Sequence, residues 1–418
     1  DPAFEAEKKA FRFEMEVESG GRERKKIFAL ETYDLDTAAL LNTVKAYDDP
    51  PDHLKRRPAL ETFLTMWLRI LHSQWQVPEL LVEFWHNHFN ISIDAHDSIS
   101  LLFPIYDREV IRKHALGNFR DMLEATAKSP CMLLYLDNAF SKSGPANENY
   151  ARDLFELHTL GAENYFNHLY DEWREVPGAW EGNAEGYIDE DVYEAARAFT
   201  GWTIGDGELH EGGAQFPLTG EFHYYDRWHD HYQKRILGKE FKSHRPPMED
   251  GLKVLDLVAF HPGTAHHLCK KLCTWLVADD PPESLVQAAA KVWINHAKSK
   301  DQIAQVVRHI LLSEEFQAHL GKKIKRPNIL VSSMLRTTEI TARPNATLFW
   351  WLQQMGYRPF TWAPPTGHPD RSAYWLNTEM MLSRWNTVPI LLVAEIEKEG
   401  IIQKKFTDQT PETADSVQ

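Results

Sequence analysis

Apolar side chains recur at intervals of three and four residues along most of the chain, which is the spacing of one face of an α-helix. In residues 59–75, Phe63 and Trp67 fall on one such face, and Pro78 then starts a second helix that runs to His86. Further helices are predicted over residues 118–128, 147–160, 190–200, 252–260, 264–277, 282–296, 302–312, 328–341, 347–355 and 377–399. The pattern predicts a mainly α fold, a multi-helix globular array with long irregular aromatic-rich loops and little β structure.

Departures from the helical period mark the loops of this array. Period-two alternation, which is typical of strands, is confined to short pieces at 91–93 and 216–225. Two stretches, 166–188 and 203–250, lack helical periodicity and are rich in Trp, Tyr, Gly and charged residues. Loops of this length are usually functional or poorly ordered, and the aromatic content here favours order.

The helical pattern predicts a single domain over residues 58–400. An N-terminal extension, residues 1–57, precedes it, and a polar C-terminal tail, residues 401–418, follows it. We find no internal repeat and no low-complexity tract.

The amino-acid composition disfavours two classes of binding partner. The 418 residues carry a formal net charge of −15, which disfavours nucleic acid and anionic membranes because both attract basic surfaces. The longest apolar runs, such as 390–393, are far shorter than a membrane span. Fourteen Trp and twenty His residues are compatible with either a packed core or a sugar-binding cleft.

The predicted helix from Asn147 is the leading candidate for chemistry. It places Glu148, Arg152 and Glu156 on one stripe at i, i+4 and i+8. A guanidinium between two carboxylates lowers their pKa values, and if Arg152 pairs with Glu156, then Glu148 or Asp153 is left free for acid–base work. The residues that we assign to catalysis are Glu148, Arg152, Asp153, Glu156 and His158. An ion-paired strut between packed helices is an equal alternative.

Two histidines near position 87 are candidate metal ligands. His86 and His88 can converge only where the helix ends, because i and i+2 point apart within a helix. His-x-His is a frequent ligand spacing, but a structural role is favoured because local spacing fixes no further ligand. Cys269 and Cys273, at i and i+4, are expected to fill the core.

An aromatic and histidine-rich cluster lies at 223–232. His229 and Asp230 are further candidate ligands for one divalent ion, and the aromatic rings are candidates for a sugar platform. An ordered surface loop is the alternative for the cluster, and a core position is the favoured alternative for Trp202. The substrate-binding residues that we predict are Asn138, Asn147, Asn149, Trp202, Tyr225 and Lys234.

The chain lacks the sequence motifs that mark several common enzyme classes. The chain has no Gly-x-Ser-x-Gly elbow, Walker loop, His-Glu-x-x-His or dinucleotide fingerprint.

Several segments together resemble one family. They are FWHNHF at 84–89, ALGNFRDML at 115–123, SPCMLLYLDN at 129–138, GPANENYARDLFELHTLG at 144–161, DVYEAARAFTGWT at 191–203, HDHYQKRILG at 229–238, FHPGTAHHLCKKLCTWLV at 260–277 and PPTGHPDRSAYWLNTEMMLSRWN at 364–386. Over residues 60–395 the chain resembles the uncharacterised bacterial family catalogued as domain of unknown function 1800. Residues 166–188 resemble an insertion in this family.

The resemblance implies a largely helical, exported protein without an assigned activity, which is often encoded beside a secreted sulfatase-like protein. A periplasmic or extracellular location follows from it. The chain departs from the family pattern at Asp153, where many members have Glu, and at His231 and Tyr232, where members have smaller residues.

The leading hypothesis is an enzyme of hydrolase or lyase type acting on a glycan or similar polar polymer. The alternatives are a non-catalytic surface protein that binds a glycan or a secreted partner, and a metal-binding protein without turnover. The sequence leaves open whether one divalent metal ion is the cofactor.

Overall fold

The helical periods of the sequence become helices in the structure. The computed structural model describes residues 1–18, 23–210, 213–338, 341–393 and 402–403. Helix accounts for 56% of the chain and strand for 10%, which confirms the prediction of a mainly α fold. Most of the predicted tail, and the last residues of the helix predicted over 377–399, lie outside the described residues.

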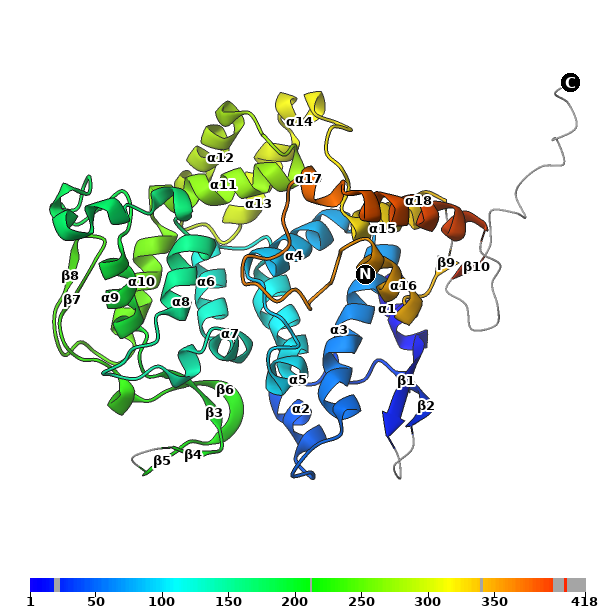
Figure 1. Ribbon diagram of the computed structural model, residues 1–418, viewed down its shortest axis with the longest axis horizontal. Coiled ribbons are helices and arrows are strands. Elements are labelled where there is room, and N and C mark those ends of the chain that lie inside the picture. Colours follow the sequence, from blue (N-terminus) through cyan, green and yellow to red (C-terminus); the bar gives the residue numbers. More distant parts are fainter. Residues whose placement is uncertain (19–22, 211–212, 339–340, 394–401, 404–418) are drawn as a thin grey trace, which may run out of the picture.

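The first half of the chain is helical apart from one N-terminal hairpin, which lies at the lower right edge in Figure 1. Its elements are α1 (Pro2–Ala10), β1 (Arg12–Glu18), β2 (Glu23–Ala29), α2 (Thr37–Val44), α3 (Asp52–His72), α4 (Gln76–His88), α5 (Asp97–Ile105), the π-helix η1 (Tyr106–Arg112), α6 (Phe119–Ala127), α7 (Pro130–Tyr135), the 3₁₀ helix η2 (Asn138–Phe140), α8 (Asn149–Asp153) and the π-helix η3 (Leu154–His158).

The second half begins with short 3₁₀ helices and α9, continues with strand pairs, and is mostly helical from α10 onward. Its elements are the 3₁₀ helices η4 (Ala162–Asn164) and η5 (Asn167–Glu175), α9 (Asp189–Ala198), β3 (Trp202–Asp206), β4 (Leu209–His210), β5 (Ala214–Gln215), β6 (Leu218–Tyr224), the 3₁₀ helix η7 (Asp226–Trp228), β7 (Lys234–Ile236), β8 (Lys239–Phe241), α10 (Glu249–Ala259), α11 (Pro262–Leu276), α12 (Glu283–Asn295), α13 (Gln302–Leu311), α14 (Glu314–Ala318), α15 (Pro327–Thr337), β9 (Thr341–Ala342), α16 (Ala346–Gln354), α17 (Ser372–Trp375), α18 (Thr378–Val393) and β10 (Ile402–Gln403).

The strands form separate antiparallel pairs rather than one sheet. The β1–β2 hairpin was not predicted, although Phe13 and Val17 alternate with polar residues and are buried. The strand-like piece at 91–93 forms no strand, whereas 216–225 contains β6, which pairs with β3. The region 203–250 is therefore ordered by hairpins.

Local sequence sets where the key helices begin. The Asn118 side chain accepts hydrogen bonds from the first backbone N–H groups of α6, as a Ser, Asp or Asn cap does. Helix α11 begins with Pro262 after His261, whose ring nitrogen accepts from the Gly263 N–H.

One continuous hydrophobic core joins these elements. Trp67, Trp85 and Trp293, from α3, α4 and α12, are fully buried in it. Helix α3 packs against α5, and α11 packs against α12. In Figure 1, α11–α14 lie along the upper side, and the chain segment that leads to α17 crosses in front of α4. Helix α4 therefore lies between the N-terminal helices and the later ones.

Candidate functional site

The predicted helix from Asn147 is solvent-facing at its charged stripe. The Asn147 side chain accepts the Asn149 N–H at 2.9 Å, close to the capping role expected of it. Arg152 lies 3.2 Å from Asp189 and 3.5 Å from Glu148. The side chains of Arg152 and Glu148 are 33% and 53% exposed, so these contacts form a surface ion-pair network. The expected clamp between Glu148 and Glu156 is replaced by one between Glu148 and Asp189.

Asp153 faces the interior of the same segment. Burial, and then repulsion from Glu156, raises the pKa of Asp153 to about 6, although Arg152 opposes the shift. Its Oδ2 atom has no hydrogen-bond partner among the described residues. Asp153 therefore has the raised proton affinity of an acid–base group, but no described pocket is lined by it.

His86 belongs to a buried ionic network. Its Nε2 lies 2.8 Å from Asp107, which also accepts from the Tyr33 hydroxyl at 2.8 Å and from Arg112 at 3.3 Å. Arg112 in turn donates to both oxygens of Glu79. Burial would raise the pKa of Asp107, but Arg112 and His86 lower it well below its usual range. The network joins α4, η1 and the N-terminal segment.

His88 points to a different neighbourhood. Its Nε2 lies 3.2 Å from the His158 carbonyl oxygen, and the rings of His88 and His158 are 6.0 Å apart. Burial lowers the pKa of both imidazoles, that of His158 to about 3. His88 Nδ1 and both His158 ring nitrogens have no hydrogen-bond partner within the described part of the chain.

His229, Asp230 and Lys234 form a third network. Lys234 Nζ lies 2.7 Å from Asp250, and His229 Nε2 lies 3.4 Å from the same carboxylate. Asp230 is paired with Arg197 at 2.9 Å. These bonds tie the loop at 229–234 to α9 and α10.

The four predicted metal ligands are thus distributed over three networks. In the residues that the structure describes, no group of three or more His, Cys, Asp or Glu side chains is arranged to hold a metal ion. Metal binding remains a prediction, and the geometry adds no support to it.

Two of the other residues that we predicted to bind substrate are buried inside the protein. Trp202 is fully buried and meets Phe199 and Phe222 edge-on, the core position given above as its alternative. Asn138 is buried and donates to the Phe199 carbonyl at 3.4 Å. Tyr225 packs against Trp228, whereas Asn149 is exposed.

Segments from distant parts of the sequence meet at a hollow of about 200 Å³ beside α4 and α11. Its lining comes from α4, η4, α11 and the segment before α17: Phe84, Asn87, His88, Glu163, His267, Lys270, Lys271, Thr274, Trp275 and Asp370. Asn87 fixes that last segment, since it accepts from the His368 N–H at 2.7 Å and donates to the His368 carbonyl at 3.1 Å. Gly367 is required beside it, because a Cβ there would lie 2.1 Å from the Asn87 carbonyl oxygen.

A carboxylate–imidazole pair lies in the wall of this hollow. Glu163 Oε1 is 2.9 Å from His267 Nδ1, and the His267 Nε2 atom is buried. Burial lowers the pKa of His267, whereas Glu163 and a hydrogen bond with the Leu157 backbone oppose the shift. This orientation of a base by a carboxylate is the logic of hydrolase triads.

Lys271 lies one helical turn after His267 on α11 and lines the same hollow. Burial lowers its pKa from 10.5 to about 8, although the nearby Asp370 and Glu163 favour the charged form. Among the described residues, the Lys271 ammonium makes no hydrogen bond or ion pair, so it is available to an anionic group.

Sequence analysis did not select Glu163, His267, Lys271 or Asp370. The usable signal was the i, i+4 spacing of His267 and Lys271 within the helix predicted over 264–277. The structure adds a second indication of a functional site in this region. His158 ends the π-helix η3, and π-helical turns frequently occur at functional sites.

A larger groove lies on the other side of η4 and α11. It has a volume of about 860 Å³ and runs beside 182–185, the β7–β8 turn and the start of α11. Asn164 and His266 line the groove, whereas the adjacent Glu163 and His267 line the hollow. Consecutive residues thus form the wall between the two spaces.

The fold and the site define a mainly helical protein with a histidine- and lysine-lined hollow next to an open groove. A family model described as "Protein of unknown function (DUF1800)" matches residues 9–417. The chain belongs to this family, which confirms the resemblance and extends it into the N-terminal segment. No significant match is found among curated proteins or among solved structures.

Proposed function

We propose that the protein is an enzyme of hydrolase or lyase type that acts on an anionic glycan at the hollow beside α11. The observation that carries the proposal is the Glu163–His267 pair, which lines the same hollow as the Lys271 ammonium. Glu163 holds the imidazole from its other side at 2.9 Å. A base and an anion-binding cation in one partly enclosed space suit proton transfer on a negatively charged sugar.

In the lyase form, His267 Nε2 takes the proton from the carbon next to a uronate carboxylate. The carbon–oxygen bond to the next sugar breaks, its electron pair leaves with the oxygen, and a carbon–carbon double bond forms. Lys271 neutralises the charge that develops on the carboxylate. In the hydrolase form, His267 takes a proton from water, which attacks the anomeric carbon while the Lys271 ammonium gives a proton to the leaving oxygen.

The proposal places one sugar residue in the hollow of about 200 Å³. The groove of about 860 Å³ is a separate space behind Glu163 and His267, and Lys239 and Lys253 line it together with Glu185 and Asp256.

The test is a screen of uronic-acid and sulfated polysaccharides with the wild type, His267→Gln and Lys271→Met. A lyase produces an unsaturated sugar that absorbs ultraviolet light, whereas a hydrolase produces reducing ends without that absorbance. We expect each variant to lose activity by at least ~100-fold, since general bases contribute about 10²–10⁴. Lys291→Met, an exposed lysine of α12, is the matched control and should keep full activity.

The earlier assignment of catalysis to residues 148–158 is tested in the same screen by Glu148→Gln and Arg152→Ala. If Glu148→Gln and Arg152→Ala lose activity while His267→Gln stays active, the reaction takes place at the network around Asp189 and not at the hollow. Turnover that is unaffected by His267→Gln and Lys271→Met would refute the proposed site.

A second candidate is glycan binding without turnover. Trp180 is 68% exposed and lies 5.9 Å from Trp173, with the Arg174 guanidinium over both rings. Such an exposed aromatic and cationic surface on the predicted insertion suits sulfated sugars. Polysaccharide that binds wild type and His267→Gln equally, with no product from either, would favour this candidate.

The proposal includes a periplasmic or extracellular location, where such polymers occur, and a secreted sulfatase-like protein as a partner in their breakdown. In the described residues no helix combines the length and the apolar character needed to cross a bilayer. Fractionation of the source cells tests the location, and co-purification tests the partner.

A further inference from the structure

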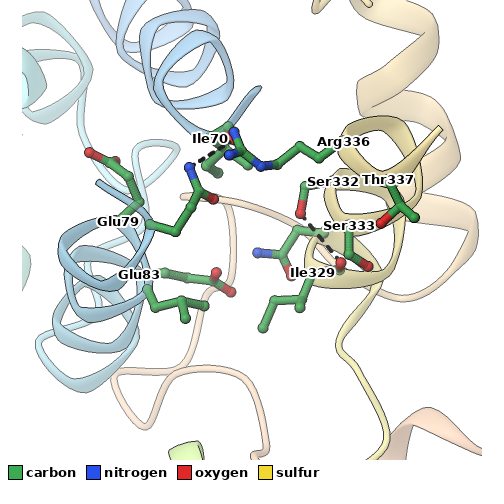
Figure 2. Close-up of a pocket in the computed structure, with 11 residues that line it drawn as sticks. Ile70, Glu79, Glu83, Ile329, Ser332, Ser333, Arg336 and Thr337 are labelled. Carbon is green, nitrogen blue, oxygen red and sulfur yellow. Dashed lines mark hydrogen bonds between the residues drawn. The ribbon is translucent and has the colours of Figure 1, made fainter. Parts of the chain in front are cut away.

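A second hollow, of about 250 Å³, lies between the N-terminal part of α4 and α15 (Figure 2). Its lining is a mixture of polar and aliphatic side chains: Ile70, Gln76, Glu79, Leu80, Glu83, Asn328, Ile329, Ser332, Ser333, Arg336 and Thr337. Figure 2 shows Glu83 on α4 facing Ile329 on α15, whereas the Glu79 carboxylate points away from α15. Neither the family match nor the proposed reaction assigns a role to this hollow.

Glu83 and Asn328 place hydrogen-bond acceptors beside this space. Glu83 is 7% exposed, and its nearest protein donors are the Asn328 side chain and the Tyr357 hydroxyl, the latter at a long 3.5 Å. Asn328 is 2% exposed, and its Oδ1 has no partner in the described structure. A buried acceptor without a donor is costly, so this arrangement favours a ligand that donates.

The other charged groups near the hollow are already engaged. Glu79 receives two hydrogen bonds of 2.9 Å from Arg112. Arg336 donates to the carbonyl oxygens of Ile70, Leu71 and Ser73, at the C-terminal end of α3. Glu83 is therefore the lining carboxylate that remains for a ligand.

One carboxylate and one amide oxygen are fewer ligands than Ca²⁺ or Mg²⁺ takes from a protein cage. An ammonium group, with three donors, matches these two acceptors better. Ile70, Leu80 and Ile329 line the remainder of the hollow and suit an aliphatic body.

We propose that the hollow between α4 and α15 binds a small primary amine, with its ammonium group on Glu83 and Asn328 and its aliphatic body against Ile70, Leu80 and Ile329. This site is separate from the proposed catalytic hollow, and its test does not depend on turnover.

The test is calorimetric titration of the full chain with n-butylammonium and with its neutral isostere n-butanol. We expect saturable binding of the amine and at least ~10-fold weaker binding of the alcohol, because a hydrogen bond to a charged group contributes about 1.5–3 kcal/mol. Glu83→Gln keeps the side-chain shape and should weaken amine binding by at least ~10-fold. Glu175→Gln, an exposed glutamate of η5, should leave binding unchanged.

Proton release provides a second readout. Burial raises the pKa of Glu83 to about 7, while Arg326 and Asn328 oppose the shift and Asp370 adds to it. Glu79, Arg336 and Tyr357 are the other titratable or charged groups that face it. Amine binding near pH 7 should therefore release about half a proton, measured in buffers of different ionisation enthalpy, and Glu83→Gln should abolish this release.

Ile329→Phe fills the hollow without changing Glu83 and should also abolish binding, which covers the case in which Glu83→Gln does not fold. Equal binding of alcohol and amine, binding that survives Ile329→Phe, or no saturable amine binding would each overturn the proposal.

Discussion

Lys271 should make the folded protein less stable at neutral pH than an apolar residue in its place. Its pKa falls from 10.5 to about 8 because burial disfavours the ammonium ion. A pKa change of one corresponds to about 1.4 kcal/mol, so the folded state loses about 3 kcal/mol by keeping this lysine charged. Lys271→Met, which fills a similar volume without charge, should recover about 1–3 kcal/mol at pH 7.

The pH dependence of the unfolding free energy tests the burial of Lys271 more directly. The unfolded chain keeps the Lys271 proton up to about pH 10.5, whereas the folded chain releases it near pH 8. The unfolded state therefore binds more protons between these values, and wild-type stability gains about 3 kcal/mol from this group as the pH rises through them. Lys271→Met lacks this gain, so the difference between the two proteins should shrink from pH 7 to pH 10.

Urea unfolding of both proteins at pH 7, 8.5 and 10, with Lys291→Met as the surface control, measures these differences. A Lys271→Met variant that is less stable than wild type at pH 7, or a stability difference that does not change with pH, would refute the burial argument. A residue that lowers stability yet is required for turnover has the trade-off expected of a functional group.

Three further variants test the networks around the site. Asp107→Asn breaks a buried ion pair and leaves Arg112 and His86 unbalanced, so urea unfolding should show a loss of about 3–5 kcal/mol; a loss below about 1 kcal/mol would contradict the network. Asp153 has its pKa raised to about 6, so its ionised form opposes folding and wild-type stability should fall between about pH 4 and 6. Asp153→Asn should remove that fall and raise stability at pH 7 by about 1–2 kcal/mol, as thermal unfolding at both pH values would show. Trp202→Ala should lower the unfolding free energy by about 3–5 kcal/mol and leave polysaccharide binding intact in the folded fraction; selective loss of binding would restore its predicted substrate role.

The helices were predictable because their apolar period is long and regular, as in α3 and α11. The β1–β2 hairpin was missed, although Phe13, Met15 and Val17 alternate, because it lies in a segment of few matched motifs. Short hairpins gain their stability from packing on the rest of the molecule, which a local pattern does not contain.

The candidate site was predictable only in part, for a related reason. His88 and His158 were both selected, and the structure brings their rings together. Glu163, His267 and Lys271 were not, because a carboxylate 104 residues away from an imidazole becomes its partner only through the tertiary fold. Arg152 was expected to bridge carboxylates on its own helix, yet it also reaches Asp189 on α9.

Helix α4 presents successive residues to different compartments: Glu83 to the hollow beside α15, His86 to the Asp107 network and His88 to the hollow beside α11. A rigid helix cannot rotate one of these side chains without the others. A ligand that turned α4 at one of these hollows would therefore move groups that line the other, and any resulting change in affinity would be equal in both directions.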